Sequence, residues 1–163
     1  MSVVVRLWRI AADAPTYAAD DASGEGSRLS GGRWNRKGIP MLYCSKSRSL
    51  ACLETVINLD PKSMPLNRYL VELAVPVDVW SKRVELNHAT APVGWDAIPC
   101  GKVSLDLGDQ WAGSLLSAIH AVPSVIVPEE TNFLINPLHP DSASIQIKKI
   151  RKWLYDPRIK ALG

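Results

Sequence analysis

Two residues in the first third of the chain have side chains that suit a binding or catalytic site. Arg33 follows two glycines in GGRWN, which let the backbone approach a ligand closely, and its planar guanidinium suits bidentate phosphate recognition. Tyr43 lies in a short apolar run on the strand face opposite Leu42, where its ring can stack on a flat heterocycle. Both residues also have a purely structural interpretation. Arg33 is then an exposed arginine in a tight turn, and Tyr43 is a core tyrosine whose hydroxyl has a hydrogen-bond partner within the protein.

A third candidate, Glu54, lies on a predicted helix over residues 46–59, which Ser45 or Ser47 can cap. Apolar residues recur along this helix with the spacing of one buried face: Leu50, Leu53 and Ile57. We therefore expect the Glu54 carboxylate at the border of that face, where burial is costly unless a partner or ligand compensates. The alternatives are a side chain that reaches solvent and a structural ion pair, for example with Arg33.

Other polar candidates lie in the second half of the chain. Ser124 follows Pro123 at the start of a predicted strand, where its hydroxyl can bind a ligand or cap the strand. No Gly-x-Ser-x-Gly elbow surrounds it, so a hydrolase nucleophile is not expected. Asn132, Asn136 and His139 lie near prolines in TNFLINPLHP, where turn chemistry accounts for them.

The elements that must position these residues are mostly strands. We predict strands over residues 3–10, 41–44, 69–75, 77–84, 124–127 and 145–155. A second helix is predicted over 109–120, with an apolar face of Trp111, Leu115, Leu116 and Ile119. Residues 11–32 form a long, small and polar loop of the kind that tends to be functional, and residues 85–108 are mostly loop. Strands and helices do not alternate regularly, which predicts an α+β fold with a mixed sheet core and flanking helices, in one domain over residues 1–163.

The composition excludes several classes of protein. With 163 residues, 47% hydrophobic, 21% charged and a net charge of +3, the chain is typical of a globular domain. Its densest basic run is Lys148, Lys149, Arg151 and Lys152, which we interpret as a solvated strand, with nucleic-acid contact as the alternative. Three cysteines and three scattered histidines predict no disulfide framework and no metal site. No signal peptide and no run of about 18 apolar residues occur, so the cytoplasm is the expected location and no membrane contact is expected.

The order of these motifs resembles the RES domain family, the toxin half of bacterial RES–Xre toxin–antitoxin pairs. The family is named for an arginine, a glutamate and a serine, which match Arg33, Glu54 in SLACLE and Ser124 in VPSVIVP. Further matches span nearly the whole chain: LWRI at 7–10, LYCS at 42–45, PVGWD at 92–96, LGDQW at 107–111, NFLINPLHP at 132–140 and YDPR at 155–158.

The resemblance implies a fold related to ADP-ribosyltransferases and an enzyme that consumes NAD⁺ as its substrate, without a further cofactor or a metal. Glu54 would stabilise an oxocarbenium-like ribose as the nicotinamide bond breaks, as in glycoside cleavage. The cation for the diphosphate would be Arg33, with Arg9 as a second candidate. Tyr43 would offer a flat surface to a ring. Ser124 would bond the ribose or the carboxamide, and His139 is a further expected ligand contact.

The resemblance also implies an antitoxin partner with an Xre-type helix-turn-helix domain, which blocks the active site and contacts DNA in place of this chain. The acceptor of ADP-ribose stays open between water, inorganic phosphate and a protein side chain. A different class of function also stays open: a non-catalytic binding module in which Arg33 and Glu54 only pair with each other. A homodimer is a common default for a soluble protein, but no sequence feature indicates an interface.

Overall fold

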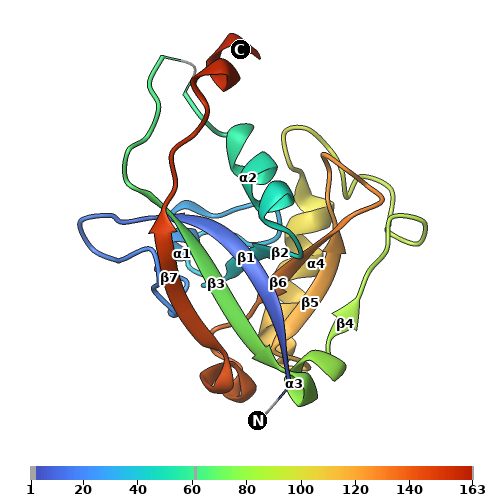
Figure 1. The fold of residues 1–163 in the computed structure, drawn as a ribbon. Helices are drawn as coiled ribbons and strands as arrows, with labels where there is room; N and C mark the ends of the chain where they lie inside the picture. The colour runs from blue at the N-terminus through green and yellow to red at the C-terminus, as the bar shows by residue number, and fades with distance from the viewer. Residues whose placement is uncertain (1–2, 61, 163) are drawn as a thin grey trace.

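The computed structural model describes residues 3–60 and 62–162, and its strands form one seven-stranded sheet in the order β4-β5-β6-β2-β1-β3-β7 (Figure 1). The strands are β1 (Val4–Ala12), β2 (Leu42–Ser45), β3 (Arg68–Pro76), β4 (Val84–Glu85), β5 (Ile119–Pro123), β6 (Thr131–Ile135) and β7 (Gln146–Lys152). Neighbouring strands are antiparallel except β4 and β5, which are parallel. The predicted α+β class with a mixed sheet is confirmed.

The sheet has a narrow junction between β1 and β2. β1 pairs with β3 along its whole length, whereas its only register pair with β2 in the described residues is Trp8 opposite Ser45. The sheet therefore consists of one half with β1, β3 and β7 and another with β4, β5, β6 and β2. Beyond the junction β1 and β2 diverge, which opens space between the two halves.

Helices cover the two halves separately (Figure 1). The helices are α1 (Glu25–Ser30), α2 (Arg48–Val56), α3 (Val77–Ser81) and α4 (Lys102–Ser114), with 3-10 helices η1 (Pro140–Ser144) and η2 (Pro157–Leu162). Through Ala51, α2 packs against Trp8 and Ile10 of β1. Through Trp111 and its neighbours, α4 packs against β5 and β6. A third apolar cluster combines buried residues from both halves of the sheet, with Leu7, Cys44 and Leu73 among its members.

The N-terminal half follows the predictions closely, except in the buried face of α2 and in a short helix, α1, within the predicted loop. Ser47 caps this helix, because its side chain accepts a hydrogen bond from the Leu50 amide. Leu50 is buried as expected, but Leu53 and Ile57 are 37% and 61% exposed. Ala51, rather than these larger residues, fills the contact with β1. The predicted loop over residues 11–32 also contains α1, a helix of six residues.

The C-terminal half departs from the predictions in several elements. The predicted strand over 77–84 is wrong, because Pro76 is the N-cap of α3 and Asp78 lies in its first turn, where a carboxylate favours a helix. The predicted helix over 109–120 in fact begins at Lys102 and ends at Ser114, and Leu115 turns the chain with a φ of 54°. Leu115 and Leu116 are therefore exposed rather than apolar contacts of a helix.

The predicted strand over 124–127 is also wrong, because β5 ends at Pro123. The Ser124 hydroxyl accepts hydrogen bonds from the Ile126 and Val127 amides at 3.1 Å each, which turns the chain. The turn returns into β6, a strand that the turn-rich TNFLINPLHP segment did not predict.

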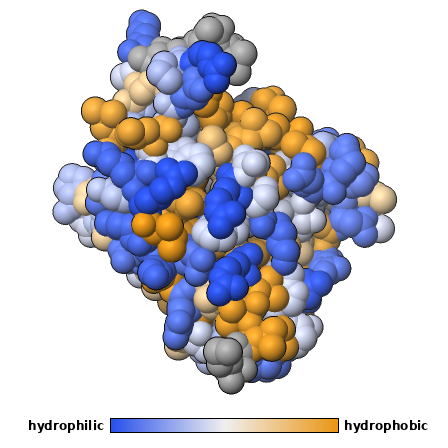
Figure 2. Space-filling model, in the orientation of Figure 1, coloured by the Kyte–Doolittle hydropathy of each residue, from blue (hydrophilic) through white to orange (hydrophobic). Residues whose placement is uncertain are grey.

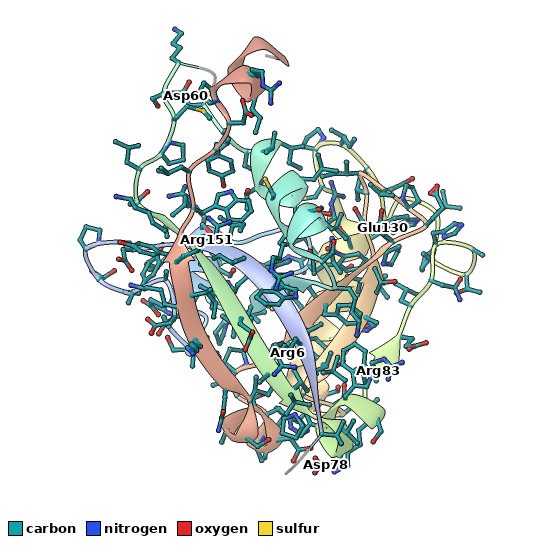
Figure 3. All side chains as sticks on the ribbon, viewed as in Figure 1. Arg6, Asp60, Asp78, Arg83, Glu130 and Arg151 are labelled. Carbon is teal, nitrogen blue, oxygen red and sulfur yellow. The ribbon has the colours of Figure 1, made fainter. Side chains whose placement is uncertain are left out.

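The basic run lies on β7, which pairs only with β3 among the described strands and so forms an edge of the sheet. Lys148, Arg151 and Lys152 are exposed (Arg151 is labelled in Figure 3), in agreement with the predicted solvated strand. Charged side chains on an edge strand disfavour pairing with other chains. Over the face in Figure 2, hydrophilic and hydrophobic residues are interspersed. In the described part of the chain, no helix is both long and apolar enough to cross a membrane.

Candidate active site

A cavity of about 1290 Å³ lies where β1 and β2 diverge. Its wall includes Trp8, Arg9 and Ile10 of β1, Tyr43, Cys44 and Ser45 of β2, and Glu54 of α2, together with the Gly31–Lys37 loop and residues 98–100. Four of the site residues predicted from the sequence thus line one cavity: Arg9, Arg33, Tyr43 and Glu54. They come from four separate segments of the chain.

The loop that carries Arg33 depends on its two glycines and its asparagine. Gly31 has a φ of 71°, and a Cβ on Gly32 would lie 2.6 Å from the Tyr43 hydroxyl oxygen, so neither position accommodates a larger residue. Asn35 is fully buried. Its side-chain nitrogen donates to the carbonyls of Ser27, Arg36 and Ile39. GGRWN therefore folds into a rigid turn, and Arg33 is the residue that this turn presents.

Helix α4 supports this turn from behind. Trp34 is buried, and its carbonyl oxygen lies so close to Gly108 of α4 that a Cβ there would be only 1.7 Å away. Arg36 bonds to both Asp109 and Asp106 of α4 at 2.7 Å. The LGDQW segment thus has a structural role in holding the Arg33 turn in place.

The Arg33 guanidinium is held by carbonyl groups rather than by a carboxylate. Its Nη1 donates to the Trp95 and Ala97 oxygens at 3.2 and 2.9 Å. Among the described residues it makes no ion pair, and Glu54 is likewise not its partner. The alternative in which Arg33 and Glu54 pair with each other is therefore wrong. No carboxylate of the described residues therefore compensates the charge of Arg33.

Tyr43 is fixed at its hydroxyl end. The hydroxyl donates to Asn35 Oδ1 at 2.5 Å and accepts from the Trp34 amide at 3.0 Å. Burial raises the pKa of Tyr43 far above its usual value of 10.0, so the hydroxyl stays protonated and remains a donor. The hydroxyl of Tyr43 is thus occupied by hydrogen bonds within the protein. The ring is the part of this side chain that remains to contact a ligand.

Glu54 has one oxygen fixed and the other without a protein partner. Oε1 accepts hydrogen bonds at 2.6 Å from both Ser124 Oγ and Asn132 Nδ2, whereas within residues 3–60 and 62–162 nothing donates to Oε2. Because the Ile126 and Val127 amides fill the acceptor positions of the Ser124 hydroxyl, its proton is directed at Glu54. Ser124, in the β5–β6 loop marked by Glu130 in Figure 3, thus holds one oxygen of the carboxylate, and Glu54 lines the cavity.

Arg9 is a second cation in the same wall. Its Nε and Nη1 atoms are buried and have no hydrogen-bond partner among the described residues. Burial lowers the pKa of Arg9 below its ordinary value, while the nearby Cys44 and Asp21 act in the opposite direction. Arg9 also lines a smaller neighbouring cavity of about 440 Å³, which extends toward Tyr17 and Asp21.

Ser124 and His139, the other two site residues predicted from the sequence, do not line the large cavity. Ser124 does not line the cavity but acts on it through Glu54. His139 lines neither cavity; its Nδ1 accepts from the Asp141 amide at 3.0 Å and caps η1, so the structure does not bring it to the other candidates. Asn132 and Ser45 were missed as site residues, because the bonds that matter join positions far apart in the sequence.

The described residues contain no group of three or more His, Cys, Asp or Glu side chains that could hold a metal ion. Cys44, Cys52 and Cys100 are all free, and only Cys44 is buried. The cavity is lined by a half-buried carboxylate and by two arginines, which offer fixed charges and hydrogen bonds to a ligand.

Comparisons with known proteins agree with the motifs. The RES domain model matches residues 6–157. The chain is 57% identical over 153 residues to the "Prs ADP-ribosylating toxin" of Sphingobium sp. (strain YBL2), covering 94% of this chain and 95% of the relative. It is 35% identical to a "Toxin Res" of Pseudomonas putida, covering 87% and 91%.

A solved structure shares the fold. The crystal structure of the M. tuberculosis MbcT–MbcA toxin–antitoxin complex matches with a TM-score of 0.60 at 15% identity, covering 99% of this chain and 90% of that one. At this identity the similarity supports the fold alone. From the match to its domain model and from its relatives, this chain belongs to the RES domain family.

Proposed function

We propose that this protein is the toxin of a toxin–antitoxin pair and that it cleaves the nicotinamide–ribose bond of NAD⁺. The observation that carries the proposal is that one cavity is lined both by Arg33, which makes no ion pair among the described residues, and by Glu54, whose Oε2 accepts no hydrogen bond from them. The relatives named toxins support the first part. NAD⁺ carries a diphosphate and a cationic ring on a ribose, which are the groups that such a cation and carboxylate suit.

The reaction needs stabilisation of positive charge on the sugar. When the C1′–N bond breaks, nicotinamide leaves with the electron pair, its ring becomes neutral, and the ribose becomes oxocarbenium-like. A carboxylate at the ribose hydroxyls stabilises that charge most when it is already oriented. In this account Glu54 Oε2 accepts from a ribose hydroxyl, while Ser124 and Asn132 hold Oε1.

Binding uses the other charged and aromatic side chains that line the cavity. Arg33, anchored at the Trp95 and Ala97 carbonyls, has its remaining guanidinium donors for the diphosphate. Arg9 is the second cation for an anionic group of the ligand. The Tyr43 ring, fixed by its hydroxyl, offers a flat surface to nicotinamide or adenine.

A second candidate function is transfer of ADP-ribose to a protein. The relative named an ADP-ribosylating toxin, which is 57% identical over nearly the whole chain, favours it. Both functions break the same bond and need the same Arg33 and Glu54; they differ in the group that attacks C1′. Water, inorganic phosphate and a protein side chain each fit a cavity of this size.

We further propose a cognate antitoxin as the partner, with an Xre-type helix-turn-helix domain that contacts DNA. The structural neighbour comes from a toxin–antitoxin complex, which supports a partner of this kind. The cytoplasm, where NAD⁺ is abundant, is the proposed place of action.

The test is to incubate the pure chain, freed of any partner, with NAD⁺ alone, with added phosphate and with cell lysate. Free ADP-ribose, a phosphorylated ADP-ribose or a labelled protein identifies the acceptor, and mass spectrometry distinguishes them. Arg33→Ala and Glu54→Ala should remain folded by circular dichroism and lose the product. If both variants unfold, the two residues are structural and the proposal fails.

A further inference from the structure

Asn132 of β6 is, beside Ser124, the second donor to Glu54. Its Nδ2 lies 2.6 Å from Glu54 Oε1, and its side chain also lines the large cavity. Its sequence context predicted only turn chemistry. In the structure Asn132 lies opposite Ser45 in the register of β6 and β2, and opposite Val122 in the register of β6 and β5. The central strands therefore fix its backbone on both sides.

Ser45 determines which end of the Asn132 amide faces the carboxylate. Ser45 Oγ donates to Asn132 Oδ1 at 2.7 Å. If the amide were reversed, its oxygen would face Glu54 Oε1 at 2.6 Å, with two acceptors in contact and no proton between them. Only the observed orientation satisfies both neighbours, and Ser45 is 3% exposed, so this donor is shielded from water.

We propose that Asn132 is a positioning residue for Glu54, and that Ser45 fixes Asn132 in the orientation that does so. The donor is an amide, which does not ionise, so its N–H group stays a donor across the pH range. Together with Ser124 it occupies Oε1 and directs Oε2 to the ligand. This inference rests on the proposed function for its kinetic test, and it predicts an effect on bond cleavage rather than on binding.

The main test is Asn132→Asp, which keeps the size of the side chain and replaces the donor with a carboxyl group beside Glu54. Two carboxylates at hydrogen-bond distance favour a shared proton, so the acid limb of the pH–rate profile should move to higher pH by about one unit or more. Loss of a hydrogen bond to a charged group should lower kcat by about 10- to 100-fold, with the KM for NAD⁺ changed less than about twofold.

Asn136→Asp is the matched control. Asn136 follows the same strand, is 1% exposed and donates to the Ala112 carbonyl at 2.9 Å, but does not line the cavity. This variant should lower the melting temperature and leave the pH limb in place. If it shifts the limb as Asn132→Asp does, or if Asn132→Asp leaves the limb and kcat unchanged, the positioning role is refuted.

A second test uses variants of Ser45. Ser45→Ala should lower kcat by about threefold to tenfold because the amide is no longer held, and Ser45→Thr, which keeps the hydroxyl, should restore it. Equal loss in both variants would contradict the inference. If the wild-type chain itself does not consume NAD⁺, the proposed function fails. The positioning contact is then tested by the carboxyl carbon signal of Glu54 in NMR, assigned with Glu54→Gln, which Asn132→Asp should perturb and Asn136→Asp should not.

Discussion

Replacing Gly108 with alanine should disturb the site from behind, through the Trp34 carbonyl. The added Cβ would lie 1.7 Å from that oxygen and 2.6 Å from the carbonyl carbon. A tolerable contact needs at least 3.0 Å, so the Arg33 turn and α4 must separate by about 1.3 Å. The obstacle is backbone rather than a flexible side chain. Trp34 is itself buried, stacked on Trp95 and adjacent to Arg33, so the turn cannot yield locally.

Two effects follow, and both can be measured. Overpacking of this kind costs about 1–3 kcal/mol, and each kcal/mol lowers the melting temperature of a domain of this size by about 2–4 °C. A misplacement near 1 Å can cost about 100-fold in turnover, so NAD⁺ consumption should fall further than stability explains. Thermal melts followed by circular dichroism measure the loss of stability. NAD⁺ turnover, measured at temperatures below the melting range, measures the loss of activity separately.

Gly113→Ala is the matched control on the same helix. A Cβ there meets nothing within 4 Å, and the position is exposed. Alanine should therefore raise stability by about 0.5–1 kcal/mol through its higher helix propensity and leave turnover unchanged. If Gly108→Ala is as stable and active as Gly113→Ala, the support of the Arg33 turn by α4 is refuted.

Two further predictions concern buried groups with unusual surroundings. Arg9→Met should raise the melting temperature, because Arg9 Nε and Nη1 are buried without a partner among the described residues and their removal relieves about 1–3 kcal/mol. The KM for NAD⁺ should rise in the same variant. A lower melting temperature would show that Arg9 is structural. His120 is buried, and burial lowers its pKa from 6.5 although its bond to the Val84 carbonyl acts in the opposite direction. The unfolded chain therefore takes up a proton at a higher pH than the folded one, so stability should fall as pH drops below about 6.5. His120→Asn, whose amide can still donate to Val84, should flatten that decline between pH 7 and 5, and an unchanged slope would exclude His120 as its source.

The sequence was most informative where local chemistry dominates. Gly31 and Gly32 mark a turn that needs a positive φ and a close approach, and Ser47 caps the helix that carries Glu54. Those signals placed Arg33, Tyr43 and Glu54, which the structure brings to one cavity.

The sequence misled at one local signal and at contacts between residues far apart in the chain. The valines of residues 77–84 have strand propensity, yet Pro76 begins a helix there. Ser124 and Asn132 join Glu54 across 70 and 78 residues, a contact that local patterns do not encode. His139 was expected at the ligand because of its neighbours in the motif, but its ring caps η1.

The central claim is that Arg33 and Glu54 act on one NAD⁺ molecule in the cavity between the sheet halves. The most direct measurement is proton NMR of NAD⁺ incubated with the pure wild-type chain and with Glu54→Gln, which keeps the size of the side chain and removes its charge. The account predicts signals of free nicotinamide from the wild type and none above the protein-free rate from the folded variant. Intact NAD⁺ in the wild-type sample, or equal release by both proteins, would contradict it.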